Sequence, residues 1–284
     1  MTLHEALIEG QRYLENKQIP DAGIDAWYLM EYALRNDSGK EITRAWFLVH
    51  RDENMEPGQY NEYRKLLNCR GRHVPLQHLT GRQEFMGISF QINDKVLIPR
   101  QDTEILVEEA MKVLKPGMKV LDMCTGSGCI IISLMKHIPG IQGMASDISR
   151  DALKVAKANA DARQVAIDFR QGNLFEAIDG THDVIVSNPP YIPTETIEAL
   201  MDEVRMFEPI EALDGGKDGL RFYRKLTTGS KDFLKPGGWL IVEIGHDQGA
   251  QVSEMMKESG FCQVHIVKDL AGQERVAAGK KHGQ

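Results

Sequence analysis

Beyond residue 100, short apolar segments that suit β-strands alternate with amphipathic segments of helical period. Strands are predicted at residues 119–122, 144–147, 165–170, 183–187, 239–244, 264–267 and 275–278. Helices are expected up to about residue 137 after the first strand, and over residues 149–159 and 220–233. Because parallel strands joined by helices require right-handed crossovers, this alternation predicts an α/β fold with a doubly wound, mostly parallel sheet. Ligands of such sheets bind at the carboxyl ends of the strands.

The first 74 residues show a helical pattern instead. Four short amphipathic segments are expected there, and none can bury an apolar face alone, so they predict a small helical bundle. A merely structural cap would show the same pattern. The apolar positions that carry the prediction are Leu3, Ala6, Leu7, Gly10 and Leu14, then Ile24, Trp27, Tyr28 and Leu34, then Trp46 and Phe47, and finally Tyr60, Tyr63 and Leu67.

Residues 75–96 are predicted to connect this bundle to a second domain over residues 97–284. Within the connector, Gly87 lies between two β-prone runs, which favours a hairpin. A chain of 284 residues is long enough for two domains.

Composition limits the partners that the chain can be expected to have. The 34 Lys and Arg against 41 Asp and Glu give a net charge of −7, which argues against a nucleic-acid backbone as the main partner. The first twenty residues lack the apolar core of a secretory signal, and the longest apolar stretch is too short to cross a bilayer, so we expect a cytoplasmic protein without a membrane partner. The nine histidines and four cysteines form no ligand cluster, so no metal is expected.

A glycine-rich turn follows the first predicted strand. Asp122-Met123-Cys124-Thr125-Gly126-Ser127-Gly128 places small residues at a helix N-terminus, where a ligand can approach the backbone. Asp147 follows at the end of the next strand, where a carboxylate can bind both ribose hydroxyls. A dinucleotide fingerprint would have a third glycine at position 131, which is Ile131. The turn therefore favours S-adenosylmethionine over NAD, although a Gly-x-Gly turn alone can be a simple connection.

The segment Ser187-Asn188-Pro189-Pro190-Tyr191 follows the apolar strand Val184-Ile185-Val186. Prolines stiffen the backbone and have no N–H, so the Asn188 side-chain oxygen and the Pro189 carbonyl can form two neutral acceptors for a planar NH2 group. Tyr191 can supply an aromatic face to the substrate or to a cationic methyl donor. An amide nitrogen is a poor nucleophile because its lone pair is delocalised, so the role expected of these acceptors is orientation and electrostatic stabilisation. A proline-stiffened loop without catalytic function is the alternative.

Further short motifs run nearly end to end, and with them the chain resembles the HemK-type glutamine-amide methyltransferases that modify peptide chain release factors. Asn-Pro-Pro-Tyr alone also occurs in other amino-group methylases, so the Leu-Ile-Pro-Arg and Gly-x-Asp-Gly-Leu pieces are the specific part. The motifs are Pro75-Leu76-Gln77 with Gly81, Glu84-Phe85 with Gly87, Leu97-Ile98-Pro99-Arg100 with Thr103-Glu104, Asp147-Ile148-Ser149, Glu208-Pro209 with Ala212-Leu213, Gly216 with Asp218-Gly219-Leu220, Glu243-Ile244-Gly245 with Gln248, Lys268-Asp269-Leu270, and Arg275-Val276.

The resemblance implies a class I methyltransferase fold and methyl transfer from S-adenosylmethionine to the glutamine amide nitrogen of a Gly-Gly-Gln motif in a release factor. It also implies that residues 1–74 help to grip the release factor. The implied catalytic residues are Asn188, Pro189 and Tyr191. The cofactor would be bound by Asp122, Cys124, Thr125, Gly126, Ser127, Gly128, Asp147, Ile148, Asn173, Leu174 and Asn188. The substrate would be bound by Asn188, Pro189, Pro190, Tyr191 and Arg100. For Arg100, an ordinary salt bridge at the entry of a helix is the alternative.

Several positions depart from the family pattern. Cys124 stands where glycine is usual, and Asn173 stands where aspartate is common at the adenine. Gln101-Asp102 replaces Pro-Glu, and His78 replaces an aromatic residue. The spacing of Cys124 and Cys129 is similar to that of a sister family that methylates a large-subunit ribosomal protein. Three alternatives remain. The protein could methylate that ribosomal protein or an amino group of nucleic acid, or it could be a binding module without catalytic activity.

Overall fold

The computed structural model describes residues 1–38 and 42–283, and the chain divides into two compact units. The helical unit comprises Met1–Arg82 together with Asp202–Phe207. The sheet unit comprises Gln83–Met201 and Glu208–Gln284. The chain therefore leaves the sheet unit once, adds six residues to the helical unit, and returns.

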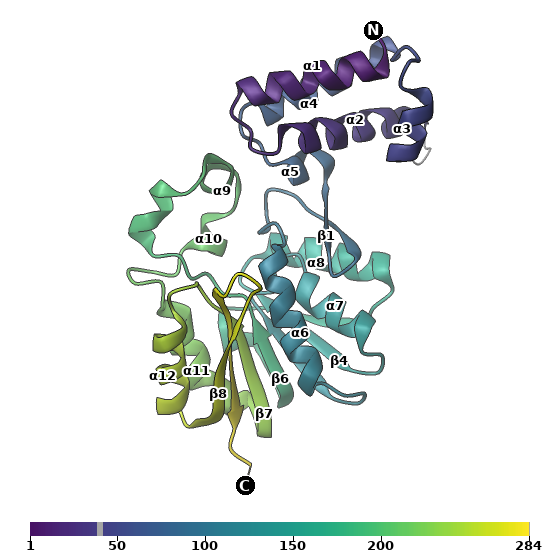
Figure 1. Ribbon diagram of the computed structural model, residues 1–284. Coiled ribbons are helices and arrows are strands. Elements are labelled where there is room, and N and C mark those ends of the chain that lie inside the picture. Colours follow the sequence, from purple (N-terminus) through teal and green to yellow (C-terminus); the bar gives the residue numbers. More distant parts are fainter. Residues whose placement is uncertain (39–41, 284) are drawn as a thin grey trace. The chain divides into compact units, whose positions relative to one another are not determined.

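Four helices dominate the helical unit, as predicted (Figure 1). The first, α1, packs against α2 and α4, and α2 also packs against α4 and α5. Gly10 allows α1 to approach α4 closely, because a Cβ at this position would lie 2.0 Å from the Tyr63 hydroxyl. The helices are α1 (Leu3–Asn16), α2 (Ala22–Ser38), α3 (Arg44–His50), α4 (Pro57–Arg70), α5 (Leu76–Thr80) and α9 (Asp202–Phe207), of which α5 and α9 were not predicted.

The buried face of α2 differs from the predicted one. Ile24 and Tyr28 were expected in the core, but their side chains are 52% and 46% exposed. Trp27 and Leu34 are buried as expected, and the Trp27 ring meets Phe47 edge-on at 5.2 Å. The rest of the inward face is formed by Ala22, Ala26, Leu29, Met30 and Ala33. Small residues at several of these positions let the neighbouring helices approach, so the larger Ile24 and Tyr28 are placed outward.

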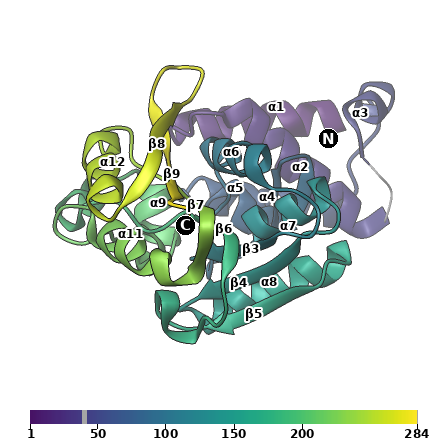
Figure 2. The ribbon, with the colours of Figure 1, turned by 90° about the horizontal axis from the view of Figure 1, so that it is seen from below.

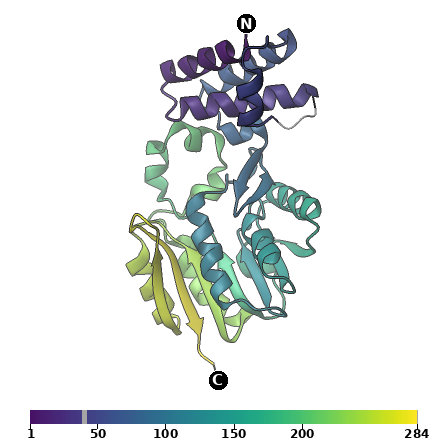
Figure 3. The same cartoon turned by 45° about the vertical axis from the view of Figure 1, so that its right-hand side comes forward.

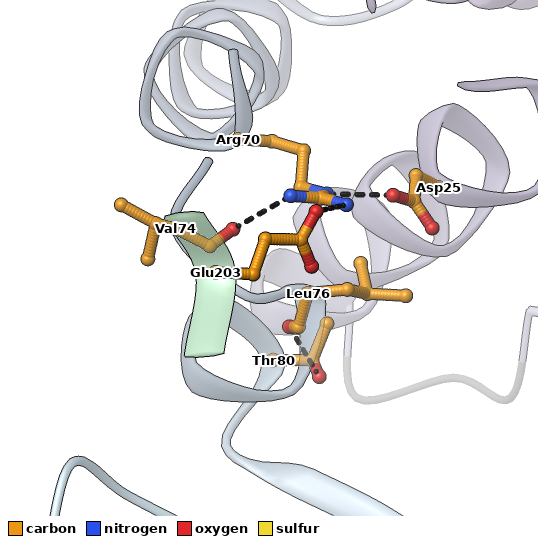
Figure 4. A network of polar contacts seen from close by, with 6 residues as sticks. All are labelled: Asp25, Arg70, Val74, Leu76, Thr80 and Glu203. Atoms are coloured by element: carbon orange, nitrogen blue, oxygen red, sulfur yellow. Dashed lines mark hydrogen bonds and ion pairs between the residues drawn. The ribbon is translucent and has the colours of Figure 1, made fainter. Parts of the chain in front are cut away.

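A buried guanidinium holds α9 in the helical unit (Figure 4). Arg70 is 4% exposed, and its Nε donates to Asp25 Oδ2 at 2.6 Å. Another guanidinium nitrogen donates to Glu203 Oε1 at 2.6 Å, and the third donates to the Val74 carbonyl at 3.3 Å. Burial raises the pKa of Asp25, and the bonds from Arg70 oppose that shift. Arg70 thus joins α4 and α2 to a helix that lies 133 residues further along the chain.

The sheet unit contains a seven-stranded sheet of order β5-β4-β3-β6-β7-β9-β8, which Figure 2 shows edge to edge. Strands β5 to β7 in this order are parallel, and β9 pairs antiparallel with both β7 and β8. The doubly wound, mostly parallel prediction is confirmed. The strands are β3 (Lys119–Met123), β4 (Gln142–Asp147), β5 (Ile167–Gln171), β6 (His182–Ser187), β7 (Leu234–Glu243), β8 (Phe261–Lys268) and β9 (Glu274–Lys281).

Helices cover both faces of this sheet. Alternate strand residues point to opposite sides, so Val120 joins one apolar cluster and Leu121 joins the other. The first cluster packs beneath α6 (Glu104–Val113), α7 (Cys129–His137) and α8 (Arg150–Arg163). The second packs beneath α11 (Arg221–Phe233) and α12 (Gly249–Glu258). The sheet unit also contains three 3₁₀ helices, η1 (Gln101–Thr103), η2 (Leu174–Ala177) and η3 (Thr194–Ala199), and the short helix α10 (Ile210–Leu213).

The predicted hairpin is present as β1 (Arg82–Phe85) and β2 (Ile88–Gln91), the blue arrows of Figure 3. Both turn residues have positive φ, 51° for Met86 and 70° for Gly87, as a two-residue type I′ turn requires. The Asn159 side chain of α8 pairs with the Gln91 backbone, with Oδ1 accepting at 2.7 Å and Nδ2 donating at 3.1 Å. The hairpin is thereby fastened to the sheet unit.

Several elements in the sheet unit differ from the prediction. Strand β7 begins at Leu234 instead of residue 239, and its pairing with β6 is irregular between Leu234 and Trp239, where Gly237 has φ 77°. Helices α6, α10 and α12 were not predicted. None of the helices within residues 1–38 and 42–283 has both the length and the apolar character needed to cross a membrane.

Candidate functional site

A cavity of about 460 Å³ opens at the carboxyl ends of β3, β4 and β6. The chain passes from β3 to β4 on one side and later returns to β6 on the other side. The loops that follow β3 and β6 therefore diverge, and a crevice forms at this switch point. Such a cavity is in the size range of small-ligand sites.

The structure brings together most of the residues predicted for the site. The predicted residues that line the cavity are Cys124, Thr125, Gly126, Ser127, Asp147, Ile148, Asn173, Leu174, Asn188 and Pro190. Those that are not among its lining residues are Asp122, Gly128, Pro189, Tyr191 and Arg100.

Two backbone N–H groups hold the Asp147 carboxylate. Gly126 N donates to Oδ2 and Ser149 N donates to Oδ1, each at 2.9 Å. Each carboxylate oxygen can accept a second hydrogen bond, so two acceptor sites remain for a vicinal diol. Burial raises the pKa of Asp147, and the backbone donors oppose this shift by stabilising the charged form.

The glycine-rich turn exposes backbone to the cavity. Gly126 has φ 55°, and a Cβ added there would meet no atom within 4 Å, so a ligand can approach this backbone. Cys124 also has a positive φ, 58°, which is a costly conformation for a residue with a side chain. This conformation gives a physical reason for the glycine that the family pattern has at this position. Burial raises the pKa of the Cys124 thiol.

Asp122 lies beneath the turn. It is fully buried, and its Oδ2 accepts a hydrogen bond from the Thr125 hydroxyl at 2.6 Å. Burial raises the pKa of Asp122 to about 7. In this arrangement Asp122 supports the turn from below.

Asn173 and Leu174 form another wall of the cavity. The Asn173 side chain donates to Glu176 Oε1 at 3.2 Å, and the Asn173 backbone N–H donates to Glu176 Oε2 at 3.2 Å, so Glu176 caps the start of η2 and holds Asn173 there. Leu174 is 8% exposed and has φ 55°. The capping bonds place an amide and an aliphatic side chain where the sequence predicts the adenine.

Asn188 lines the cavity directly after β6. Its Nδ2 donates to the Thr103 hydroxyl at 3.2 Å. The nitrogen end of the carboxamide is therefore engaged on the side of η1, which leaves the oxygen end for another partner. Pro189 and Pro190 are both buried.

Tyr191 is not among the residues that line the cavity, and its polar atoms are engaged elsewhere. Its hydroxyl donates to Glu243 Oε1 at 3.3 Å, and its carbonyl accepts from Gln248 Nε2 at 3.0 Å. Two glycines pack on its backbone, because a Cβ at Gly215 would lie 2.7 Å from Tyr191 Cα and one at Gly219 would lie 2.4 Å from the Tyr191 carbonyl oxygen. Tyr191 therefore fixes the position of the Asn-Pro-Pro segment.

Arg100 forms an ion pair with the buried Glu208. Arg100 directly follows residues 95–99, and Glu208 directly precedes residues 209–214. The ion pair therefore holds these two segments together. Most residues of both segments line the cavity, and so does Phe222. These residues and Thr103 were not assigned to the site from the sequence. The signal was present, because Leu97-Ile98-Pro99-Arg100 and Glu208-Pro209 are among the motifs shared with the family.

The residues present fit S-adenosylmethionine. Asp147 offers paired acceptors to a ribose, the open backbone at Gly126 admits close contact, and Leu97, Ile148 and Leu174 supply apolar walls. Within the part of the chain that the structure describes, no group of three or more His, Cys, Asp and Glu side chains is arranged to hold a metal ion.

Comparisons with known proteins show which proteins the chain is similar to. Family models for the PrmC N-terminal domain and the methyltransferase small domain match residues 5–81 and 101–207. The chain is 39% identical to a release factor glutamine methyltransferase of Geobacter sulfurreducens, over 98% of this chain and 96% of that protein. It is 37% identical to one from Clostridium acetobutylicum over 100% of both. A methyltransferase from Pyrococcus furiosus, 20% identical with a TM-score of 0.54, covers 69% of this chain with 90% of its own and confirms the predicted class of fold.

Proposed function

The chain belongs to the family of release factor glutamine methyltransferases, and from this we propose that it transfers a methyl group from S-adenosylmethionine to the glutamine side-chain amide nitrogen of a Gly-Gly-Gln motif in a peptide chain release factor. One observation of the structure carries the proposal. Asn188 lines the same cavity as the diol-binding carboxylate Asp147, and its nitrogen end is engaged by Thr103. A neutral acceptor therefore remains beside the expected methyl donor.

The methyl transfer does not require a strong base. S-adenosylmethionine supplies a methyl group on a positively charged sulfur. The bond from carbon to sulfur breaks as the bond from carbon to nitrogen forms, and the nitrogen then releases one proton to water. In this proposal the Asn188 oxygen accepts one N–H group of the substrate amide and the Pro189 carbonyl, as expected from the sequence, accepts the other, which would align the nitrogen with the methyl carbon.

The remaining site residues have supporting roles in this proposal. Asp147 holds the ribose, the turn from Cys124 to Gly128 lies against the amino-acid part of the donor, and Asp122 supports that turn. Ile148, Asn173 and Leu174 surround the adenine. Pro190 stiffens the segment, Tyr191 anchors it, and Arg100 orders the substrate side of the cavity through Glu208.

The helical unit is proposed to bind the protein substrate. In this reading residues 1–74 form a substrate-recognition domain, residues 75–96 a connector, and residues 97–284 the methyltransferase domain. A release factor works in translation, so the proposal also places the protein in the cytoplasm.

Mass spectrometry of a release factor incubated with the protein and S-adenosylmethionine tests the proposal. We expect one added methyl group, located on the glutamine of Gly-Gly-Gln. Ribosomal protein and nucleic-acid substrates in parallel reactions test the alternatives. Methylation of one of these, with none on the release factor, would contradict the proposal.

Asn188→Ala tests the assigned role of the carboxamide. We expect turnover to fall at least about 100-fold, because the substrate amide loses its oriented acceptor, while donor affinity stays within about tenfold. Gln251→Ala removes an exposed carboxamide from α12 and is the matched control. Unchanged turnover of Asn188→Ala would remove Asn188 from the mechanism.

A further inference from the structure

One face of helix α8 supports the glycine-rich turn of the cavity. Ala152, Ala156, Asn159 and Arg163 follow one another at the spacing that places side chains on one side of a helix. Ala152 lines the cavity. Ala156 packs against the turn, because a Cβ added at Gly128 would lie 3.1 Å from the Ala156 Cβ and 3.3 Å from its Cα. The turn therefore rests directly on this face of α8.

Asn159, one helical turn further along this face, is only 2% exposed. Its Nδ2 donates to the Ser127 carbonyl at 2.9 Å and to the Gln91 carbonyl at 3.1 Å. Its Oδ1 accepts from the Gln91 backbone N–H at 2.7 Å. Both hydrogens of the side-chain amide are thus used, and the Gln91 N–H determines which end of the carboxamide is the oxygen. A single side chain therefore joins the glycine-rich turn to the last residue of β2.

Strand β2 leads into another part of the cavity wall. The chain continues from Gln91 to residues 95–97 and Pro99, which line the cavity, and Ser127 lines it from the glycine-rich turn. Asn159 itself is not among the lining residues. Any influence of Asn159 on a ligand must therefore pass through these two segments of the wall.

The glycine-rich turn needs support from outside. Residues 124–128 belong to neither a helix nor a strand, and Cys124, Gly126 and Gly128 all have positive φ. No regular ladder of hydrogen bonds therefore fixes the Ser127 carbonyl, and the Asn159 amide is the side chain that does so.

We propose that Asn159 is a positioning residue, which holds the glycine-rich turn and the segment after β2 in the relative placement that the methyl donor requires. This inference rests on the proposed function, in which the turn lies against the amino-acid part of S-adenosylmethionine. Asn159 acts on the donor only through the backbone of Ser127 and Gln91.

Asn159→Ala removes all three hydrogen bonds and keeps a residue that favours the helix. We expect the donor Kd, measured by titration calorimetry, to rise roughly tenfold, because the Ser127 carbonyl loses its partner and the turn its fixed position. Bound donor restores that position, so kcat at saturating donor should stay within about threefold of wild type. A merely structural role would lower stability without this division between Kd and kcat.

Arg163→Met is the matched control. From the same face of α8 the Arg163 guanidinium donates to the Ser89 carbonyl of β2, so it fastens the same strand. Methionine keeps much of the aliphatic chain and leaves the bonds of Asn159 intact. We expect Arg163→Met to lower the free energy of unfolding, as Asn159→Ala does, but to keep its donor Kd within about twofold of wild type. An equal rise of Kd in both variants would show that general loosening of the hairpin is the cause, and the proposal would be wrong.

Hydrogen exchange measured by NMR tests the link in the unaltered protein. If Asn159 couples the turn to β2, donor binding to the turn must stabilise the bond at Gln91, because such coupling is reciprocal. S-adenosylmethionine should therefore slow exchange of the Gln91 N–H at least about threefold in wild type and in Arg163→Met. Unchanged exchange of this amide on donor binding would contradict the proposal, and this measurement does not depend on the folding of Asn159→Ala.

The backbone signals of Gly126 and Gly128 give a readout without any donor. They should shift in Asn159→Ala and keep their wild-type positions in Arg163→Met. If the glycine signals behave in this way but the protein neither binds S-adenosylmethionine nor methylates a release factor, the proposed function fails while the positioning of the turn stands. Glycine signals that are identical in wild type and Asn159→Ala, or a donor Kd of that variant within twofold of wild type, would overturn the inference.

Discussion

At the scale of single residues, Asp147 shows how the backbone prepares a side chain for a ligand. Two N–H groups, from Gly126 and Ser149, fix the carboxylate before any donor binds. A charged acceptor held in this way contributes about 1.5–3 kcal/mol for each hydrogen bond to a ligand.

Removal of this carboxylate should therefore affect binding more than turnover. We expect Asp147→Ala to raise the donor Kd at least about tenfold, with kcat at saturating donor within about threefold. Titration calorimetry and steady-state kinetics measure the two quantities. Asp151→Ala, which removes an exposed carboxylate from the next helix, is the control. A lower kcat with unchanged Kd would disprove the ribose assignment.

The backbone conformation of Cys124 is less favourable for cysteine than it would be for glycine. Its φ of 58° is unfavourable for a residue with a Cβ by about 1 kcal/mol. Cys124→Gly should consequently raise the free energy of unfolding by about 0.5–1 kcal/mol, as measured by urea denaturation. Cys262→Gly, in strand β8, should lower it, since no positive φ is relieved there. A loss of stability in both variants would show that the Cys124 side chain contributes more than its conformation costs.

At the scale of elements, the segment that follows α10 packs closely against the loop from Asn188 to Tyr191 because two of its residues are glycines without side chains. Gly215 and Gly219 lie directly against the Tyr191 backbone, and Gly219 also has φ 72°. This contact gives a packing reason for the Gly-x-Asp-Gly-Leu motif, which from the sequence could be recognised only by resemblance.

A methyl group at position 219 should displace the loop. We expect Gly219→Ala to destabilise the protein by about 3 kcal/mol or more and to reduce turnover, because strain in φ and overlap with the Tyr191 carbonyl add. Gly260→Ala has the same positive φ problem but open space around the new Cβ, so it should cost only about 1–2 kcal/mol and keep its turnover. Thermal unfolding and kinetics compare the two variants. Equal effects would mean that the contact with Tyr191 is unimportant.

Features that depend on neighbouring residues in the sequence were predicted correctly, and features that depend on contacts between distant residues were missed. The strands of the sheet were found because each is a continuous apolar or alternating run, which is a local signal. Cavity residues such as Asp147 and Asn188 were found because their position at a strand end is also local. Thr103, by contrast, is separated from its partner Asn188 by 85 positions in the sequence, and no sequence pattern near Thr103 indicates that contact. The outward position of Ile24 and Tyr28 depends on which helices pack on α2, which is equally non-local.

At the scale of the whole molecule, Arg70 links segments that are distant in sequence. Its guanidinium pairs with Asp25 of α2 and with Glu203 of α9, and both Arg70 and Asp25 are buried. Removing one partner of a buried ion pair leaves an uncompensated charge, which costs more than the pair contributes.

Arg70→Met should therefore destabilise the protein by about 3–5 kcal/mol in urea denaturation. Arg70→Met combined with Asp25→Asn should recover part of that loss, because no buried charge then remains unpaired. Glu203→Gln keeps an acceptor for Arg70 and should cost about 1 kcal/mol. If the double variant were less stable than Arg70→Met by the full effect of Asp25→Asn alone, the two residues would be independent.

The return of α9 to the helical unit also has a consequence for synthesis. Residues 1–82 leave the ribosome well before residues 202–207, and the 119 residues between them take roughly 6–24 seconds to translate at about 5–20 residues per second. During that interval the nascent bundle has Arg70 and Asp25 without Glu203. The helical unit is thus completed only when much of the sheet unit has already been translated. Folding of the helical unit therefore depends on synthesis of the sheet unit, although the two are separate compact units.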